Sequence, residues 1–313
     1  MTLQLPESFT NLIRSVFEQK GEQLLADLPM LIDEASQRWN ITAIEPVPNL
    51  SYNFVAHAKR GSEDVILKIG VLNRELLSEM NTLKFFNGEG ICRLLEHDEE
   101  KGMFLLERLK PGKMLSELED DDERTHIAVE VMQKTCRPVD MESDSLLSDV
   151  RQRAAGLQRF IPLTDWFDEL KTIRPRFNGG TGPIPARLLE RVEDSLPDLF
   201  AREGNFLLHG DFHHFNILSS ERGWLVIDPK GVIGPMGYEI GPFMLNPWNM
   251  SMDWSRFKVQ AARRVDIFHE RLGWDREKII AWALAHSILS ACWDLDLDPG
   301  YAIEAAEIFA GLK

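Results

Sequence analysis

Apolar side chains recur every three or four positions between residues 24 and 35, which predicts helical structure in the stretch before Trp39. The spacing then changes to short segments rich in β-branched residues, separated by turn-forming residues such as those at 59–62. Residues 74–86 return to the helical period. The expected strands of this unit are residues 44–55, 64–69, 91–95 and 103–109. Residues 1–109 therefore predict an N-terminal lobe made of N-terminal helices, an antiparallel sheet and one inserted helix.

The pattern after Pro111-Gly112 is mostly helical and predicts a second, larger lobe over residues 110–313. Its expected helices lie at residues 121–135, 146–160, 166–172, 186–194 and from 254 to the end, and its expected strands at 205–208 and 217–227. The most apolar run, residues 279–293, is shorter than the roughly 20 residues that a bilayer span needs. It predicts a buried helix, and we expect no membrane partner.

The composition excludes several classes of protein. Lys and Arg number 35 and Asp and Glu 50, so the formal charge is 35 − 50 = −15, which argues against nucleic-acid binding. A chain this acidic favours a cationic or metal-bridged partner, although most such charge only solvates a surface. Three widely spaced cysteines argue against a disulfide framework or a zinc site. Because the first residues also lack the pattern of a secretory signal, we expect a cytoplasmic protein.

The chemistry-bearing segment is a polar loop between two apolar stretches. The loop carries Asp211 and Asn216, and the second apolar stretch ends at Asp228. Phosphoryl transfer needs one carboxylate at the attacking hydroxyl group, and a second carboxylate with an amide oxygen to hold Mg²⁺ against nucleotide phosphates. We therefore expect Asp211 to be the catalytic carboxylate and Asn216 and Asp228 to be the metal ligands.

The string His209-Gly210-Asp211, with Asn216 five residues after the aspartate, resembles the catalytic loop of kinases in its aminoglycoside-phosphotransferase form. The double histidine at 213–214 and the string at 224–231 are similar to those of the streptomycin 6-phosphotransferase group, the aminoglycoside/hydroxyurea antibiotic resistance kinases. The resemblance extends over nearly the whole chain. It implies an α+β, bilobal protein-kinase-like fold that binds ATP and Mg²⁺ in the crevice between a small β-rich lobe and a larger helical lobe.

The same resemblance implies the nucleotide site. Lys68 matches the strand lysine that pairs with nucleotide phosphates, and Ser51 and Asn53 match the loop that covers them. The main chain from Glu107 to Leu109 matches the interlobe connector that grips adenine. Lys68 needs a carboxylate partner on the following helix, where Glu75 and Glu79 lie one turn apart, and their positions relative to Leu83 favour Glu79.

The acceptor site is expected in the helical lobe. Asp294 follows the apolar helix directly and is the favoured contact for a cationic small molecule, with Glu239 a second candidate. The alternative for these acids is helix capping or solvent exposure. Streptomycin, hydroxyurea and an unrelated metabolite alcohol or sugar all remain possible acceptors. A nucleotide-binding pseudokinase scaffold is the alternative from another class, and a scaffold has no chemical need for a complete catalytic set.

The sequence also departs from common kinase patterns. It lacks a Gly-x-Gly-x-x-Gly loop over the phosphates, and Glu239 stands where many relatives carry Asp. For His213 and His214 a structural role in the loop is favoured over metal binding, because adjacent side chains point in different directions. We expect His209 to orient the loop backbone rather than to transfer protons.

Overall fold

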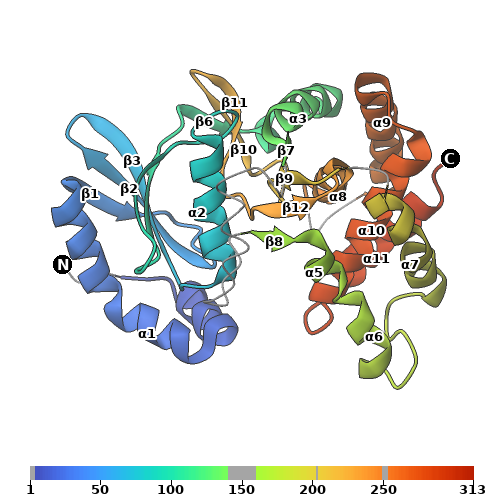
Figure 1. Ribbon diagram of the computed structural model, residues 1–313, viewed down its shortest axis with the longest axis horizontal. Coiled ribbons are helices and arrows are strands. Elements are labelled where there is room, and N and C mark those ends of the chain that lie inside the picture. The colour runs from blue at the N-terminus through green and yellow to red at the C-terminus, as the bar shows by residue number, and fades with distance from the viewer. Residues whose placement is uncertain (1–3, 140–159, 202–203, 249–252) are drawn as a thin grey trace.

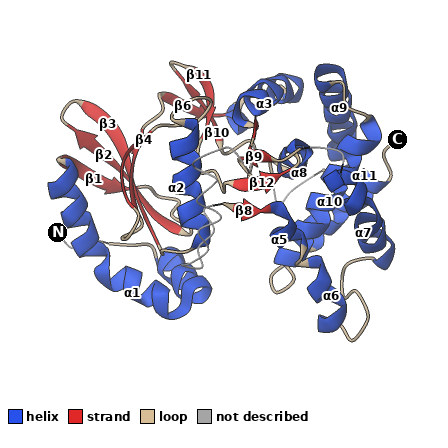
Figure 2. Ribbon diagram, viewed as in Figure 1, coloured by secondary structure: helices blue, strands red, loops and turns tan. Residues whose placement is uncertain are grey.

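The computed structural model describes residues 4–139, 160–201, 204–248 and 253–313. A strand-rich part and a mostly helical part lie side by side, with helix α2 (Arg74–Phe86) between them (Figures 1 and 2). This arrangement confirms the α+β class and the order of lobes predicted from the sequence.

The first sheet is antiparallel, in the order β1-β2-β3-β5-β4. Its strands are β1 (Ile41–Pro46), β2 (Asn53–Arg60), β3 (Glu63–Gly70), β4 (Leu94–Asp98) and β5 (Met103–Glu107). Helix α1 (Glu7–Trp39) shares a buried apolar core with this sheet. The single strand predicted at 44–55 is wrong, because residues 47–52 form a loop between β1 and β2. Pro48 lies in this loop and has no N–H to donate to a strand ladder.

Helix α2 has the bounds that its periodicity predicts, and its N-terminus is capped by Asn73, whose side chain accepts from the Leu76 N–H at 2.8 Å. Its apolar residues Leu76, Met80, Leu83 and Phe86 belong to the same buried core as the helical lobe. The Ser78 hydroxyl donates to the carbonyl of Gly231 at 2.6 Å. A Cβ at Gly231 would lie 2.5 Å from the hydroxyl oxygen of Ser78, so only glycine lets α2 approach this segment so closely. The helix therefore joins the two lobes.

The chain leaves the first sheet at Glu107 and enters a small sheet of order β11-β10-β6 at Pro111. A second small sheet has the order β7-β9-β12-β8. The short strands are β6 (Pro111–Met114), β7 (Arg137–Pro138), β8 (Ile161–Pro162), β9 (Phe206–Leu208), β10 (Ile217–Ser220), β11 (Gly223–Val226) and β12 (Val232–Gly234). The strand predicted at 217–227 is thus a hairpin of β10 and β11. These small sheets present the loops that carry Asp211 and Asp228.

Helices surround these sheets. They are α3 (Asp121–Thr135), α5 (Leu163–Phe167), α6 (Leu170–Arg176), α7 (Ala186–Ala201), α8 (Ile240–Leu245), α9 (Trp254–Leu272), α10 (Arg276–Trp293) and α11 (Gly300–Ala310), with short 3₁₀ turns at Leu115–Glu117 and Met236–Glu239. The helix predicted at 166–172 is divided between α5 and α6, and the one predicted at 146–160 lies outside the described residues except for Phe160.

Helix α10 is the buried helix that the apolar run predicts, and Trp282 on it is fully buried. Across the described part of the chain, no helix is both long enough and apolar enough to span a bilayer.

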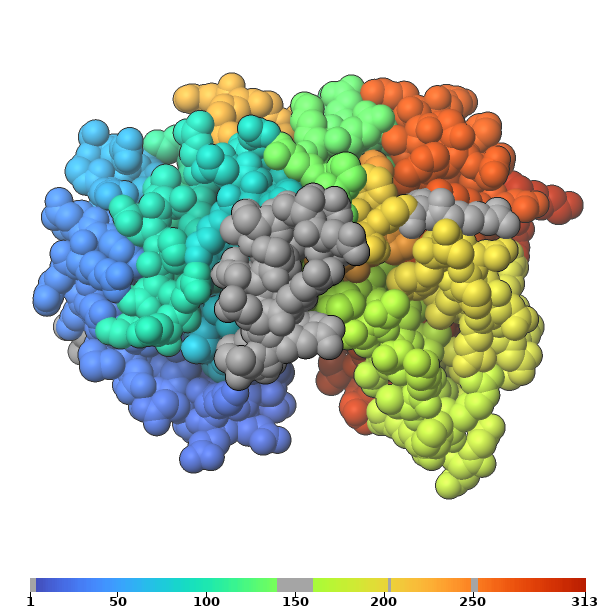
Figure 3. All heavy atoms as spheres, viewed as in Figure 1, coloured from blue at the N-terminus to red at the C-terminus, as the bar shows by residue number. Residues whose placement is uncertain are grey.

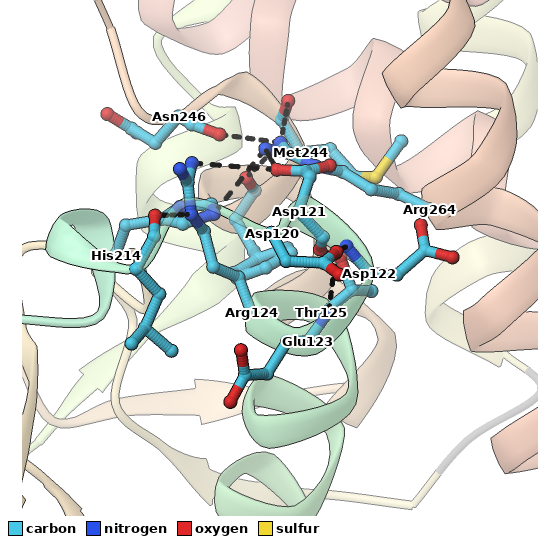
Figure 4. A network of polar contacts seen from close by, with 12 residues as sticks. Asp120, Asp121, Asp122, Glu123, Arg124, Thr125, His214, Met244, Asn246 and Arg264 are labelled. Atoms are coloured by element: carbon cyan, nitrogen blue, oxygen red, sulfur yellow. Dashed lines mark hydrogen bonds and ion pairs between the residues drawn. The ribbon is translucent and has the colours of Figure 1, made fainter.

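A buried ion pair fastens the catalytic loop to the helices around it (Figure 4). Arg264 of α9 donates to both carboxylate oxygens of Asp121 at 2.8 and 2.7 Å, and to the carbonyl of Asn246 after α8 at 2.6 Å. His214, from the loop before β10, stacks on Phe243 with ring centroids 4.1 Å apart, and its Nε2 lies 3.4 Å from the Arg264 guanidinium. Helices α3, α8 and α9 and the loop therefore meet at Arg264.

This arrangement predicts a large difference between two neighbouring aspartates. Asp121→Asn leaves the buried guanidinium without a charged partner and should lower the free energy of unfolding by about 3 to 5 kcal/mol. Asp122→Asn is the matched control in the same helical turn. It breaks an exposed pair with Arg263 and should cost less than about 1 kcal/mol. Urea unfolding measures both losses, and equal losses would contradict the role given to Arg264.

Candidate active site

The loop between β9 and β10 carries Asp211 and is closed by Asn216. The Asn216 Nδ2 donates to the main-chain carbonyl of Asp211 at 3.0 Å, so the amide oxygen of Asn216 is the atom left to face a cation. The Asp211 carboxylate is 38 % exposed, and Asp211 lines a cleft. The His213 Nε2 lies 3.4 Å from the Asp211 carboxylate. Although desolvation opposes the charge, His213 holds the pKa of Asp211 well below its usual range, so the carboxylate is ionised near neutral pH.

His209 fixes the backbone of this loop, as its sequence position predicts. Its Nε2 donates to the carbonyl of Ile227 at 2.7 Å, and its Nδ1 accepts from the main-chain N–H of Asp211 at 3.2 Å. Burial lowers the pKa of His209 to about 4. The ring is therefore neutral, and both nitrogens hold main-chain groups rather than a substrate.

Glu239 does not reach the cleft, which corrects its assignment as an acceptor contact. The side chain is fully buried, and its carboxylate accepts from the main-chain N–H groups of His209 and Gly210. Burial raises the pKa of Glu239 to about 8. The Glu239 side chain reaches the loop from the 3₁₀ turn before α8. It is a positioning residue, since it acts through the loop that carries Asp211.

Lys68 joins the two lobes through carboxylates. Its Nζ lies 2.7 and 2.8 Å from the two Glu79 oxygens and 2.6 Å from Asp228 Oδ1, and its side chain is only 3 % exposed. Burial alone would lower the pKa of Lys68, but Asp228 and Glu79 outweigh it and raise the pKa, so the ammonium stays charged. Of the two candidate glutamates, the structure pairs Glu79 with Lys68 and leaves Glu75 on the cleft wall.

Asp228 is held in a left-handed backbone conformation, with φ at 60°, directly after the β10–β11 hairpin. This conformation is uncommon outside glycine, and Asp tolerates it better than most residues. Desolvation favours the neutral acid, but Lys68 outweighs it and lowers the pKa of Asp228. The ionised Asp228 and the amide oxygen of Asn216 are hard oxygen donors, which suits Mg²⁺. Asn216 directly precedes β10 and Asp228 follows β11, so the two residues flank the β10–β11 hairpin at the end that the loop carrying Asp211 enters.

The two adjacent histidines have different surroundings. His213 contacts Asp211, while His214 is fully buried between Phe243 and Arg264. Burial and the Arg264 charge lower the pKa of His214 far below its usual value. In the described residues no cluster of three or more His, Cys, Asp and Glu side chains could hold a metal ion. Because the two rings have different partners, their geometry favours a structural role in the loop.

Asp211 lies at a cleft of about 590 Å³ between the lobes, which we call the interlobe cleft. Figure 3 shows the surface hollowed between α1 and the helical lobe at the lower edge of the view. The interlobe cleft is lined by residues of α1, the β1–β2 loop, α2, the catalytic loop and α10. Its carboxylates are Glu75, Glu79, Asp211 and Asp294, and its aromatic side chains are Phe17, Tyr52, Trp166 and Trp293. The arrangement suits a cationic molecule with a flat apolar surface.

The structure brings four of the expected residues to this cleft: Asn53, Glu79, Asp211 and Asp294. Ser51 is exposed and does not line it, and Glu107 and Leu109 lie on the connector instead. The Glu107 carboxylate accepts from the Arg93 N–H at 3.0 Å and pairs with Arg222, so its side chain is already engaged.

Several lining residues have no local signal in the sequence. Val16, Phe17, Trp166 and His286 reach the cleft from helices far apart in the chain. Lys230 is the exception, since it lies two residues after Asp228 in the string at 224–231, which resembles that of the streptomycin 6-phosphotransferase group. Desolvation opposes the charge of Lys230, but Asp211 and Asp228 outweigh it and raise the pKa of Lys230. Its ammonium therefore adds a positive charge beside the two catalytic-site carboxylates.

Sequence comparisons with known proteins point to one family. The sequence model of the aminoglycoside/hydroxyurea antibiotic resistance kinases matches residues 43–297. A streptomycin 6-kinase of Streptomyces glaucescens is 26 % identical over 316 residues, covering 99 % of this chain and 98 % of that protein. A hydroxyurea phosphotransferase of Kitasatospora aureofaciens is 29 % identical over 297 residues, covering 93 % and 81 % respectively.

Solved structures share the fold at low sequence identity. A choline/ethanolamine kinase family protein from Mesorhizobium loti superimposes with a TM-score of 0.56 at 15 % identity, covering 93 % of both chains. An aminoglycoside phosphotransferase solved with ADP and hygromycin B gives a TM-score of 0.57 at 12 % identity, covering 89 % of this chain and 97 % of that one. They confirm the kinase-like fold that the sequence predicts. The chain belongs to the aminoglycoside/hydroxyurea antibiotic resistance kinase family and is a small-molecule phosphotransferase.

Proposed function

We propose that the protein transfers the γ-phosphoryl group of ATP to a hydroxyl group of a cationic, ring-bearing molecule of the streptomycin type. The observation that carries this proposal is the ionised Asp211 at an acidic, aromatic cleft, beside the buried Lys68 with its two carboxylates. A cytoplasmic location, where ATP is available, fits this activity.

The nucleotide occupies the crevice next to the first sheet. The adenine ring is held by the main chain of Glu107 to Leu109, since the Glu107 carboxylate is engaged with Arg222. Asn53 and the neighbouring Ser51 cover the phosphates, and Lys68 exchanges its contact with Asp228 for a phosphate oxygen while it keeps Glu79. An ammonium already charged and dehydrated needs little reorganisation to meet a phosphate.

Asn216 and Asp228 would hold Mg²⁺ through their side-chain oxygens, and the ion would supply positive charge against the nucleotide phosphates. Asp211 accepts a hydrogen bond from the acceptor hydroxyl at a carboxylate oxygen and orients the attacking oxygen. It receives the hydroxyl proton as the new P–O bond forms and as the bond from the γ-phosphorus to the bridging oxygen breaks, which releases ADP. Lys230 lies beside Asp211 and Asp228 with a positive charge and stabilises the phosphoryl group during transfer.

The acceptor lies in the interlobe cleft. Asp294 and Glu75 attract its positive charge, and Trp166 and Trp293 pack against its ring, with their own ring centroids 5.5 Å apart. The similarity to streptomycin 6-kinases supports this class of acceptor. Hydroxyurea is the second candidate, supported by the hydroxyurea phosphotransferase among the relatives. It is smaller than one sugar ring, whereas a cleft of about 590 Å³ is the size that encloses a drug-sized ligand.

The first prediction concerns Asp211. Asp211→Asn removes the group that receives the proton and should lower kcat by about 10² to 10⁴, while ATP affinity changes little. A coupled assay of ADP release with streptomycin and with hydroxyurea measures kcat, and calorimetry measures nucleotide binding. Asp168→Asn, an exposed aspartate outside the cleft lining, is the control. A near-normal kcat in Asp211→Asn, or no turnover of either acceptor by the wild type, would contradict the proposed function.

The second prediction concerns charge recognition by Asp294. Asp294→Asn should raise the KM for streptomycin several-fold and leave the KM for ATP unchanged, because only the acceptor faces this carboxylate. Asp296→Asn is the matched control two residues away, at a side chain that is 82 % exposed and outside the cleft lining.

The same variants should differ in their response to salt. The Debye length falls from about 10 Å at 0.1 M ionic strength to about 3 Å at 1 M, so the wild-type KM for streptomycin should rise with salt and that of Asp294→Asn should rise less. If the KM for streptomycin changes neither with the substitution nor with the salt concentration, the proposal of an acidic acceptor site is wrong.

A further inference from the structure

Helix α1 contributes to the interlobe cleft from a part of the chain that the family's sequence model does not cover. That model matches residues 43–297, whereas Val16 and Phe17 of α1 line the cleft together with Asp211 and Trp293. The remaining cleft residues all lie within the matched range. One wall of the site therefore comes from outside the segment that defines the family.

This wall has a fixed position, because α1 is bent directly after Phe17. Glu18 has the non-helical angles φ 49° and ψ −125°, which a non-glycine residue adopts only where its surroundings impose them. After the bend the two halves of α1 touch: a Cβ at Gly21 would lie 2.3 Å from the carbonyl oxygen of Ile13. Ile13 and Phe9 are fully buried in the core that α1 shares with the first sheet. The bend is therefore anchored on both sides and presents Val16 and Phe17 to the cleft.

Three large side chains at the rim of the cleft are open to solvent, whereas Val71 and Leu76 deeper in its lining are buried. Val16 is 47 % exposed, Tyr52 50 % and Trp293 46 %, although most large apolar side chains of the described residues are buried. Trp293 is the last residue of α10, and His286 lies two helical turns earlier on the same helix. Both line the cleft, and their ring centroids are 6.2 Å apart. The cleft thus has an apolar rim on both sides and charged groups at Asp211 and Lys230.

We propose that Val16 and Phe17 form the outer wall of the acceptor site and determine the size of acceptor that the enzyme uses. This inference rests on the proposed function. An acceptor that presents a hydroxyl to Asp211 and is long enough to reach the rim covers Val16 and Phe17 and gains from removing their apolar surface from water. A small linear acceptor such as hydroxyurea reaches Asp211 without touching this wall. The wall therefore selects ring-bearing acceptors of the streptomycin type.

The test changes the wall in both directions and measures kcat/KM for streptomycin and hydroxyurea with saturating ATP and Mg²⁺. Val16→Trp narrows the cleft and should lower kcat/KM for streptomycin about tenfold, or ~1.4 kcal/mol. Phe17→Ala removes apolar contact and should raise the KM for streptomycin by a similar factor. Met30→Trp is the matched control, since Met30 is also an exposed apolar residue of α1, at 59 %, but does not line the cleft. The KM for ATP should stay constant in all three variants.

Each outcome decides the inference. The inference is supported if kcat/KM falls only in Val16→Trp and Phe17→Ala, and only with streptomycin as the acceptor. A streptomycin KM equal to the wild type in both variants overturns it and leaves the proposed function intact. A loss of the same size in Met30→Trp also overturns it, because the effect is then a general one on α1. If the wild type phosphorylates hydroxyurea but not streptomycin, the acceptor class and this inference both fail, and the general phosphotransferase activity stands. Val16 is exposed, so its replacement tests the wall even where Phe17→Ala proves unstable.

Discussion

A single buried ammonium group, that of Lys68, lies between a carboxylate from each lobe. Glu79 comes from the helix between the lobes and Asp228 from the segment after the β10–β11 hairpin. Removing Lys68 would leave the buried Glu79 carboxylate without the cation that it contacts, which costs far more than breaking an exposed pair. This constraint sets the relative position of the sheet, helix α2 and the catalytic segment, and the contact of Ser78 with Gly231 reinforces it one turn along α2. The cleft exists where it does because these elements are fixed together.

The loop that carries Asp211 depends on a second set of buried groups, which lie outside the cleft lining. His209 and Glu239 make hydrogen bonds that fix the backbone of this loop. Arg264 contacts His214 of the same loop and also residues of α3 and α8, while it lies itself on α9. Each of these side chains is buried; His209 and Glu239 contact main-chain groups, Arg264 contacts main-chain groups and Asp121, and His214 stacks on Phe243. Asp211 is thereby left as the exposed carboxylate of a rigid loop. Such preorganisation matters in phosphoryl transfer, where positioning and electrostatics supply most of the catalysis.

The sequence predicted the parts of the fold that local chemistry determines. Residues 74–86 and 121–135 have the predicted helix bounds, because Asn73 and Asp120 cap them and the apolar period is clear. The single strand predicted at 44–55 was wrong, since a loop that contains Pro48 divides it into the end of β1 and the start of β2. The short strands β7, β8 and β12 carry too few residues to show a period.

The residues of the site also fall into those that local sequence could indicate and those that it could not. Asp211, Asn216, Asp228 and Lys68 were proposed from the sequence because they lie on short strings whose chemistry is specific, and the structure puts Lys68 in contact with Asp228 and Asn216 in contact with Asp211. Glu239 was misassigned, since nothing in the local pattern tells a buried carboxylate that holds a backbone from one that faces a cleft. Val16, Phe17 and Trp166 were not predicted at all, because only tertiary packing brings α1 and α5 to the catalytic loop.

The most direct test of this account is a crystal structure with a non-hydrolysable ATP analogue and Mg²⁺. We expect the γ-phosphate beside Asp211, the metal contacted by Asn216 and Asp228, and Lys68 on a phosphate oxygen with its Glu79 contact retained. A nucleotide bound outside the crevice, or a Lys68 that stays on Asp228 while the phosphates lie elsewhere, would contradict the central role given to this buried ammonium group.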